Sequence, residues 1–232
     1  MSTSMPSDST CWTLIRGAAV GAGEDREDFA RRYVTVVRAY LSHRWKSSPL
    51  LSELDDVAQE VFVECFRQGG VLDRIREDQP ASFRAFLYGV TRNVAMRCER
   101  RIGKQRERQP AGPVEPEEVE SDEATMSRVF DRAWALALFR QAGDLQEERA
   151  KVAGERAMKR VELLRLRARE NLPIRDIAKL WERDAAEVHK EYARARNEFR
   201  AALEEVLSFH HPGASAAEIE EKCNQLLELI RG

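Results

Sequence analysis

Apolar residues recur at helical spacing through much of this chain. Between Asp25 and Trp45 they stand three or four positions apart, at Phe29, Tyr33, Val36, Val37, Tyr40 and Leu41. This spacing gives a helix one apolar stripe, so it predicts a helix that packs into a core. Similar patterns predict helices over residues 55–68, 83–108, 126–168 and 215–230. We therefore expect an all-α fold.

A more compact pattern lies between residues 172 and 203. Ile174, Ile177 and Ala178 form one short apolar stripe, and a longer stripe begins at Val188. The residues between them predict a turn at 181–183. This arrangement is typical of a helix-turn-helix motif, and it also fits an ordinary helical hairpin.

Polar and proline-rich segments divide the chain into domains. Residues 1–24 are expected to be a flexible N-terminal segment, and residues 109–125 a flexible linker containing three prolines. Two small helical domains then cover residues 25–108 and 126–209, the second with the helix-turn-helix pattern. Residues 210–232 form a C-terminal helical extension.

The near-neutral net charge of −2 hides strong segregation of charge. Residues 83–108 carry eight cationic and two acidic residues, with aromatic residues at the start of the segment. This pattern favours polyanion binding, although a solvated helix end also fits. Six acidic residues follow between positions 115 and 123 with no cation among them. They could fold back onto the basic helix, but we expect solvation.

Several classes of protein lack support in the sequence. There is no glycine-rich phosphate loop or metal-binding spacing, and the four cysteines form no C-x-x-C pair. We therefore expect free thiols, no cofactor, no metal and no catalytic residues. No apolar run is long enough to span a membrane and no signal peptide is visible, which predicts a cytoplasmic protein without membrane insertion.

Two strings resemble a known family. Residues 54–62 read LDDVAQEVF and residues 83–93 read FRAFLYGVTRN. Together they resemble bacterial sigma factors of the extracytoplasmic-function group. The helix-turn-helix pattern at 172–203 resembles the second conserved domain of that family, and it follows in the expected order. The resemblance spans most of residues 25–205.

The resemblance implies partners and site residues. It implies that core RNA polymerase binds Asp55, Asp56, Gln59 and Glu60. It implies that the promoter minus-ten element is bound and melted by Phe83, Tyr88, Arg92, Asn93, Arg97, Arg100 and Arg101. The connector 71–81 would hold an extruded base, which costs a few kcal/mol to unstack. The minus-thirty-five element would be read by the second domain through His189, Lys190, Glu191 and Arg194.

The second domain departs from the family pattern. Glu182 and Arg183 stand where family members usually place glycine and an apolar residue. Residues 184–200 also carry four cations and four acids, which is unfavourable for a groove-binding helix. One alternative is therefore a degenerate sigma-like protein that binds polymerase or a regulator without promoter recognition. Another is an unrelated helical enzyme. An anti-sigma or other regulatory protein is a further expected partner.

Overall fold

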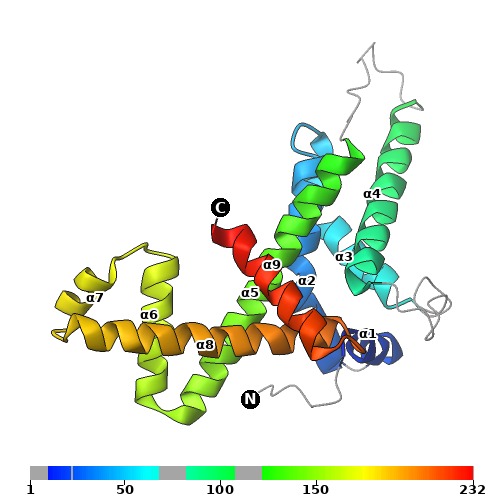
Figure 1. The fold of residues 1–232 in the computed structure, drawn as a ribbon. Coiled ribbons are helices and arrows are strands. Elements are labelled where there is room, and N and C mark those ends of the chain that lie inside the picture. The colour runs from blue at the N-terminus through cyan, green and yellow to red at the C-terminus, as the bar shows by residue number, and fades with distance from the viewer. Residues whose placement is uncertain (1–9, 22, 68–81, 108–121, 232) are drawn as a thin grey trace. The chain divides into compact units, whose positions relative to one another are not determined.

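The computed structural model describes residues 10–21, 23–67, 82–107 and 122–231 (Figure 1). Within these residues the chain forms helices and turns but no strand, which confirms the all-α class. The chain divides into two compact units, Ser9–Ala137 and Leu138–Gly232. The predicted base pocket at 71–81 and most of the predicted linker lie outside the described residues.

The first unit contains α1 to α4 and the beginning of α5. Its elements are α1 (Cys11–Val20), α2 (Gly23–Arg44), the 3-10 helix η1 (Pro49–Glu53), α3 (Leu54–Cys65), α4 (Phe83–Glu107) and the N-terminal part of α5 (Glu123–Ala153). Helix α3 packs against both α2 and α4. The exposed edges of α3 and α4 therefore belong to one packed group of helices.

Aromatic side chains form much of the core of this unit. Phe29 meets Phe62 and Phe66 edge to face, with ring centroids 5.8 and 5.1 Å apart. Tyr33 stacks on Trp134 of α5, with centroids 5.6 Å apart and an interplanar angle of 6°. Such pairs add specific geometry to the burial of large apolar rings. The apolar stripe predicted for residues 25–45 is thus the central layer of the core.

Helix α1 corrects the expectation of a flexible segment for residues 10–21, the part of the range 1–24 that precedes α2 and is described. Thr10 caps the helix by accepting a hydrogen bond from the Thr13 amide at 3.2 Å. Trp12 packs edge to face on Phe83 and Phe86, at 5.1 and 5.7 Å. Ten residues form only a marginal helix in isolation, so this tertiary contact explains why the segment is ordered.

The second unit is built from the rest of α5 and four further helices. These are α6 (Glu155–Ala168), α7 (Ile174–Leu180), α8 (Ala185–His210) and α9 (Ala216–Arg231). Gly154 separates α5 from α6 with a φ of 99°, a left-handed conformation that glycine adopts without strain. Helix α9 packs against α8, and it buries Ile219 and Cys223.

Helices α7 and α8 share a small core with α6. Leu163, Ile174, Ile177 and Val188 are buried together. Residues 181–184 connect the two helices, where the sequence pattern placed the turn. Asp184 caps α8 by accepting hydrogen bonds from the amides of Ala186 and Glu187 at 2.8 and 3.1 Å. Glu182 in this turn has a φ of 50°.

Candidate protein and nucleic-acid interfaces

Helix α3 presents the acidic edge that the sequence predicted. Its buried stripe contains Leu54, Val57, Ala58, Val61 and Cys65. The helical repeat therefore turns Asp55, Asp56 and Gln59 to the exposed side, and Glu60 is partly exposed. Asp55 also forms an ion pair with Arg38 of α2. Three of the four predicted polymerase-binding residues thus lie on an open surface.

An apolar residue extends this edge, and sequence reasoning missed it. Val63 is 61% exposed and stands four positions after Gln59, so both lie on one side of α3. A large apolar side chain at an exposed position of an otherwise polar face is the signal that could have found it. The edge therefore combines charge with apolar surface, as protein interfaces do.

The basic end of α4 lies next to the acidic edge. Arg97 forms ion pairs with Glu60 and Glu64 of α3, at 3.2 and 3.1 Å. Arg101 lies 3.8 Å from Glu53 and 3.9 Å from Glu60. Both arginine side chains remain about half exposed, at 49% and 57%. Glu60 therefore connects a predicted polymerase site to two predicted DNA-binding residues.

The remaining predicted residues on α4 have three different environments. Asn93 and Arg100 are exposed. Phe83 is only 1% exposed, because Trp12, Tyr33 and the rings around them cover it. Phe83 therefore belongs to the core and presents no ring face to an unpaired base. This burial corrects its predicted placement on the DNA-binding surface.

Tyr88 and Arg92 contact the beginning of α5. The Tyr88 hydroxyl donates a hydrogen bond to Glu123 at 2.7 Å, and Arg92 forms an ion pair with the same carboxylate at 2.9 Å. The hydrogen bond from Tyr88, followed by the contact with Arg92, lowers the pKa of Glu123. Partial burial and the bond to Glu123 raise the pKa of Tyr88. Glu123 belongs to the acidic run that we expected to be solvated, and its contact with α4 corrects that expectation for this residue, while positions 115–120 lie outside the described residues.

Glu99 is the acidic residue in the middle of the basic α4 sequence, and it points inward. Arg44 donates to its two carboxylate oxygens at 2.6 and 2.9 Å, and the Trp45 indole donates at 2.8 Å. Charge-assisted, bidentate bonds of this kind are stronger than bonds between neutral groups. They hold the end of α2 against the middle of α4.

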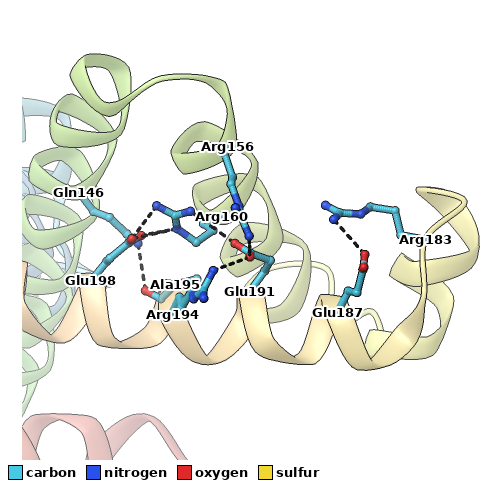
Figure 2. Close-up of polar contacts among 9 residues, drawn as sticks. All are labelled: Gln146, Arg156, Arg160, Arg183, Glu187, Glu191, Arg194, Ala195 and Glu198. Carbon is cyan, nitrogen blue, oxygen red and sulfur yellow. Dashed lines mark hydrogen bonds and ion pairs between the residues drawn. The ribbon is translucent and has the colours of Figure 1, made fainter.

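In the second unit, Glu191 is the centre of a polar network (Figure 2). Its carboxylate lies 2.6 Å from Arg156, 3.4 Å from Arg160 and 3.0 Å from Arg194. The hydrogen bond from Arg156 and the contacts with Arg160 and Arg194 lower the pKa of Glu191. Only 7% of the residue is exposed. It was predicted to face a DNA groove, and the structure corrects this: Glu191 holds α8 against α6.

The other three predicted minus-thirty-five residues lie at the surface of α8. His189, Lys190 and Arg194 are exposed, although Arg194 also contacts Glu191. A second ion pair joins Arg160 to Glu198 at 2.8 Å (Figure 2). The outer face of α8 therefore presents His189, Lys190 and Arg194 to solvent. The acidic residues Glu191 and Glu198 of the same helix pair with arginines of α6.

The described residues offer no metal-binding cluster of three or more histidine, cysteine, aspartate or glutamate side chains. The four cysteines are free and buried. None of the helices that the structure describes combines the length and apolar character required to cross a membrane.

Comparison with known families identifies the part of the chain that carries the acidic edge and the basic helix. The family model for sigma-70 region 2 matches residues 29–106. This range begins within α2 and ends within α4. No curated protein matches the sequence.

Proposed function

We propose that this chain is a sigma factor of the sigma-70 family, because the family model for region 2 matches residues 29–106, and that it directs promoter recognition and DNA melting. The match supports a role in RNA polymerase binding and transcription initiation. The proposal further assigns polymerase binding to the surface of α3 and DNA binding to the surface of α4. The single observation that carries it is the family match over α2, α3 and α4, which contain most of the predicted first-domain site residues. We propose a cytoplasmic location on the same basis.

In this proposal, the exposed edge of α3 docks on core RNA polymerase. Asp55, Asp56 and Gln59 supply polar contacts and Val63 supplies apolar area. Three of these side chains are exposed and polar, and Val63 extends the same side of the helix. Charged groups at such an interface favour fast and specific association, while the apolar contact contributes burial.

The promoter strand would follow the basic end of α4. Arg97, Arg100 and Arg101 are exposed cations within five positions, and cations at this density neutralise neighbouring phosphates. Tyr88 and Arg92 are the candidates for contact with unpaired bases and their backbone. Phe83 is left out of this surface because it is buried. The role of the connector 71–81 as a base pocket remains part of the proposal through family resemblance.

We propose that α7 and α8 form the helix-turn-helix that reads the minus-thirty-five element, with His189, Lys190 and Arg194 facing the groove. The burial of Glu191 supports this assignment in one respect. It removes an acid from the outer face of α8 and leaves that face more cationic than the sequence count indicated.

A second candidate function is a sigma-like protein that binds polymerase or a regulator without promoter selectivity. The engagement of Arg194 and Arg160 with acids of α8 favours it, because these cations are partly neutralised internally. An anti-sigma protein is a candidate regulator in either case.

Run-off transcription separates the two functions. Core RNA polymerase is mixed with the full chain and with promoter fragments recovered by sequencing DNA that co-purifies with the protein from cells. We expect transcripts with defined start sites that depend on the protein. Polymerase binding without any transcript would contradict the first function and support the second.

A further inference from the structure

The N-terminal part of α5 covers a face of α4 with acids and aromatic rings. The described segment begins at Asp122, which caps the helix by accepting a hydrogen bond from the Ala124 amide at 3.2 Å. The next residue, Glu123, contacts both Tyr88 and Arg92 of α4. The start of α5 therefore places a carboxylate on two residues assigned to promoter DNA.

A second acid makes a parallel contact one turn earlier on α4. Asp131 accepts a hydrogen bond from Arg84 Nε at 2.5 Å, and the Ser127 hydroxyl lies 3.1 Å from the same guanidinium. Arg84 also lies over the rings of Tyr88 and Phe130, at 5.5 and 5.6 Å from their centroids. Both cations in the first ten residues of α4 are thus paired with acids of α5.

Aromatic contacts lie between these ion pairs. Phe130 meets Tyr88 of α4 edge to face at 5.2 Å, while Trp134 stacks on Tyr33 of α2. Proteins bind single-stranded DNA by pairing cations with phosphates and by packing rings against bases. The start of α5 places carboxylates on Arg84 and Arg92 and an aromatic ring on Tyr88. DNA would place phosphates and bases on residues of these kinds.

We propose that the carboxylates of Glu123 and Asp131 are internal competitors that occupy Arg92, Tyr88 and Arg84 of α4 until DNA phosphates displace them. This inference rests on the proposed function, since it takes Tyr88 and Arg92 as DNA contacts. Both ion pairs are partly solvent-exposed: Glu123 is 55% and Asp131 is 53% exposed at the side chain. Pairs of this kind are weak individually, so a polyanion can displace these two carboxylates while Phe130 and Trp134 stay packed in the core.

The test uses the full chain with the substitutions Glu123→Gln and Asp131→Asn, which remove two charges and keep the shapes. The probe is a fluorescent 20-nucleotide single strand of mixed sequence, and binding is measured by anisotropy at low salt. We expect the double variant to bind about five- to tenfold more tightly than the parent chain. Adding Arg92→Ala to the double variant should reduce that gain, because the released cation is then absent.

A matched control carries Asp144→Asn and Glu148→Gln, which make the same change in net charge further along α5. The affinity of this control for the oligonucleotide should rise less than twofold. Equal gains in the control and the test variant would mean that net charge alone acts, and would overturn the proposal. An unchanged affinity in the test variant, including no detectable binding by any variant, would also overturn it.

Hydrogen exchange provides a second measurement. Amides of residues 123–129, the part of α5 before the buried Phe130, should exchange faster when the oligonucleotide binds, because the start of α5 loses its contacts with α4. Unchanged exchange with bound DNA would overturn the proposal. Polymerase binding is measured for the same variants. If the variants bind polymerase but their affinity for DNA does not rise, the internal competitor is contradicted and the proposed function is not. If the parent chain fails to bind polymerase, the proposed function itself is contradicted.

Discussion

Arg97 of α4 and Glu60 of α3 form an ion pair at 3.2 Å, and this pair joins two surfaces for which we propose different partners. Arg101 approaches the same carboxylate at 3.9 Å. A partner that engages Glu60 therefore removes a competing acid from two cations. The surfaces proposed to bind polymerase at α3 and DNA at α4 share this residue.

The substitution Glu60→Gln should separate these two effects. It removes the carboxylate that pairs with Arg97 and Arg101, so we expect the affinity for single-stranded DNA to rise about two- to fivefold. Affinity for core polymerase should fall. Asp56→Asn is the matched change on the same helix, and it should weaken polymerase binding without altering DNA affinity. Anisotropy with labelled DNA and with labelled polymerase checks both, and equal DNA affinities for the two variants would contradict the shared role.

Replacement of Arg97, Arg100 and Arg101 by alanine should weaken promoter binding and flatten its dependence on salt. Each lost phosphate contact reduces the slope of log affinity against log salt concentration by about 0.7 to 0.9. We therefore expect a reduction of about 2 to 3 for the triple variant, measured by anisotropy across salt concentrations. The control Arg16→Ala, Arg31→Ala, Lys46→Ala removes three exposed cations outside α4 and should keep the parent slope. Both triple variants should still bind core polymerase.

Glycine should stabilise the turn between α7 and α8. Glu182 has a φ of 50°, and the left-handed region costs a residue with a Cβ about 1 kcal/mol. We expect Glu182→Gly to raise the free energy of unfolding of this unit by about 0.5 kcal/mol after the greater entropy of the unfolded chain is included. Urea denaturation measures it. Glu187→Gly in the first turn of α8 should have the opposite sign, with a loss of about 1 kcal/mol.

Removal of the Glu191 charge should destabilise the second unit. In Glu191→Gln, three arginines lose an ionised acceptor, and Arg160 is itself only 14% exposed at its side chain. We expect a loss of about 2 kcal/mol in the free energy of unfolding. Glu187→Gln removes an exposed charge that pairs with Arg183 (Figure 2), and it should change stability by less than about 0.5 kcal/mol. Similar losses in both variants would show that the network at Glu191 adds nothing.

The contribution of Glu191 should also depend on pH. The hydrogen bond from Arg156 and the contacts with Arg160 and Arg194 lower its pKa below the ordinary value of 4.5. The unfolded chain therefore takes up a proton first as the pH falls, and the stabilisation is complete above 4.5 and lost below it. The difference in stability between parent and Glu191→Gln should be constant from pH 7 to 5.5 and should shrink toward pH 3. A constant difference over the whole range would contradict this assignment.

The helices could be predicted because each depends on a local pattern. The stripe from Phe29 to Leu41 defines α2 by spacing alone, and residue types between Asp55 and Glu60 define the exposed edge of α3. Both properties follow from the repeat of one helix. They need no knowledge of what the helix packs against.

The residues that were misplaced depend on contacts distant in the sequence. Phe83 looked like an aromatic residue beside a basic track, but Trp12, 71 positions earlier, covers it. Glu191 looked like an outward residue of α8, but arginines of α6 surround it. Glu123 looked like part of a solvated run, but its partners are Tyr88 and Arg92. In each case a tertiary neighbour decided the environment, and single-sequence periodicity contains no information about that neighbour.

The inward orientation of Glu99 changes how the electrostatic potential of α4 should be calculated. Counted along the sequence, this acid lies among arginines and would reduce the attraction of the helix for a polyanion. Its charge is instead compensated by Arg44, a cation from another helix that the sequence count for α4 omits. Glu99 therefore contributes little to the potential that an approaching phosphate meets, and the acids that do reduce it come from α3 and α5, at Glu60, Glu64 and Glu123. A charge sum over α4 alone includes Glu99 and omits these three acids.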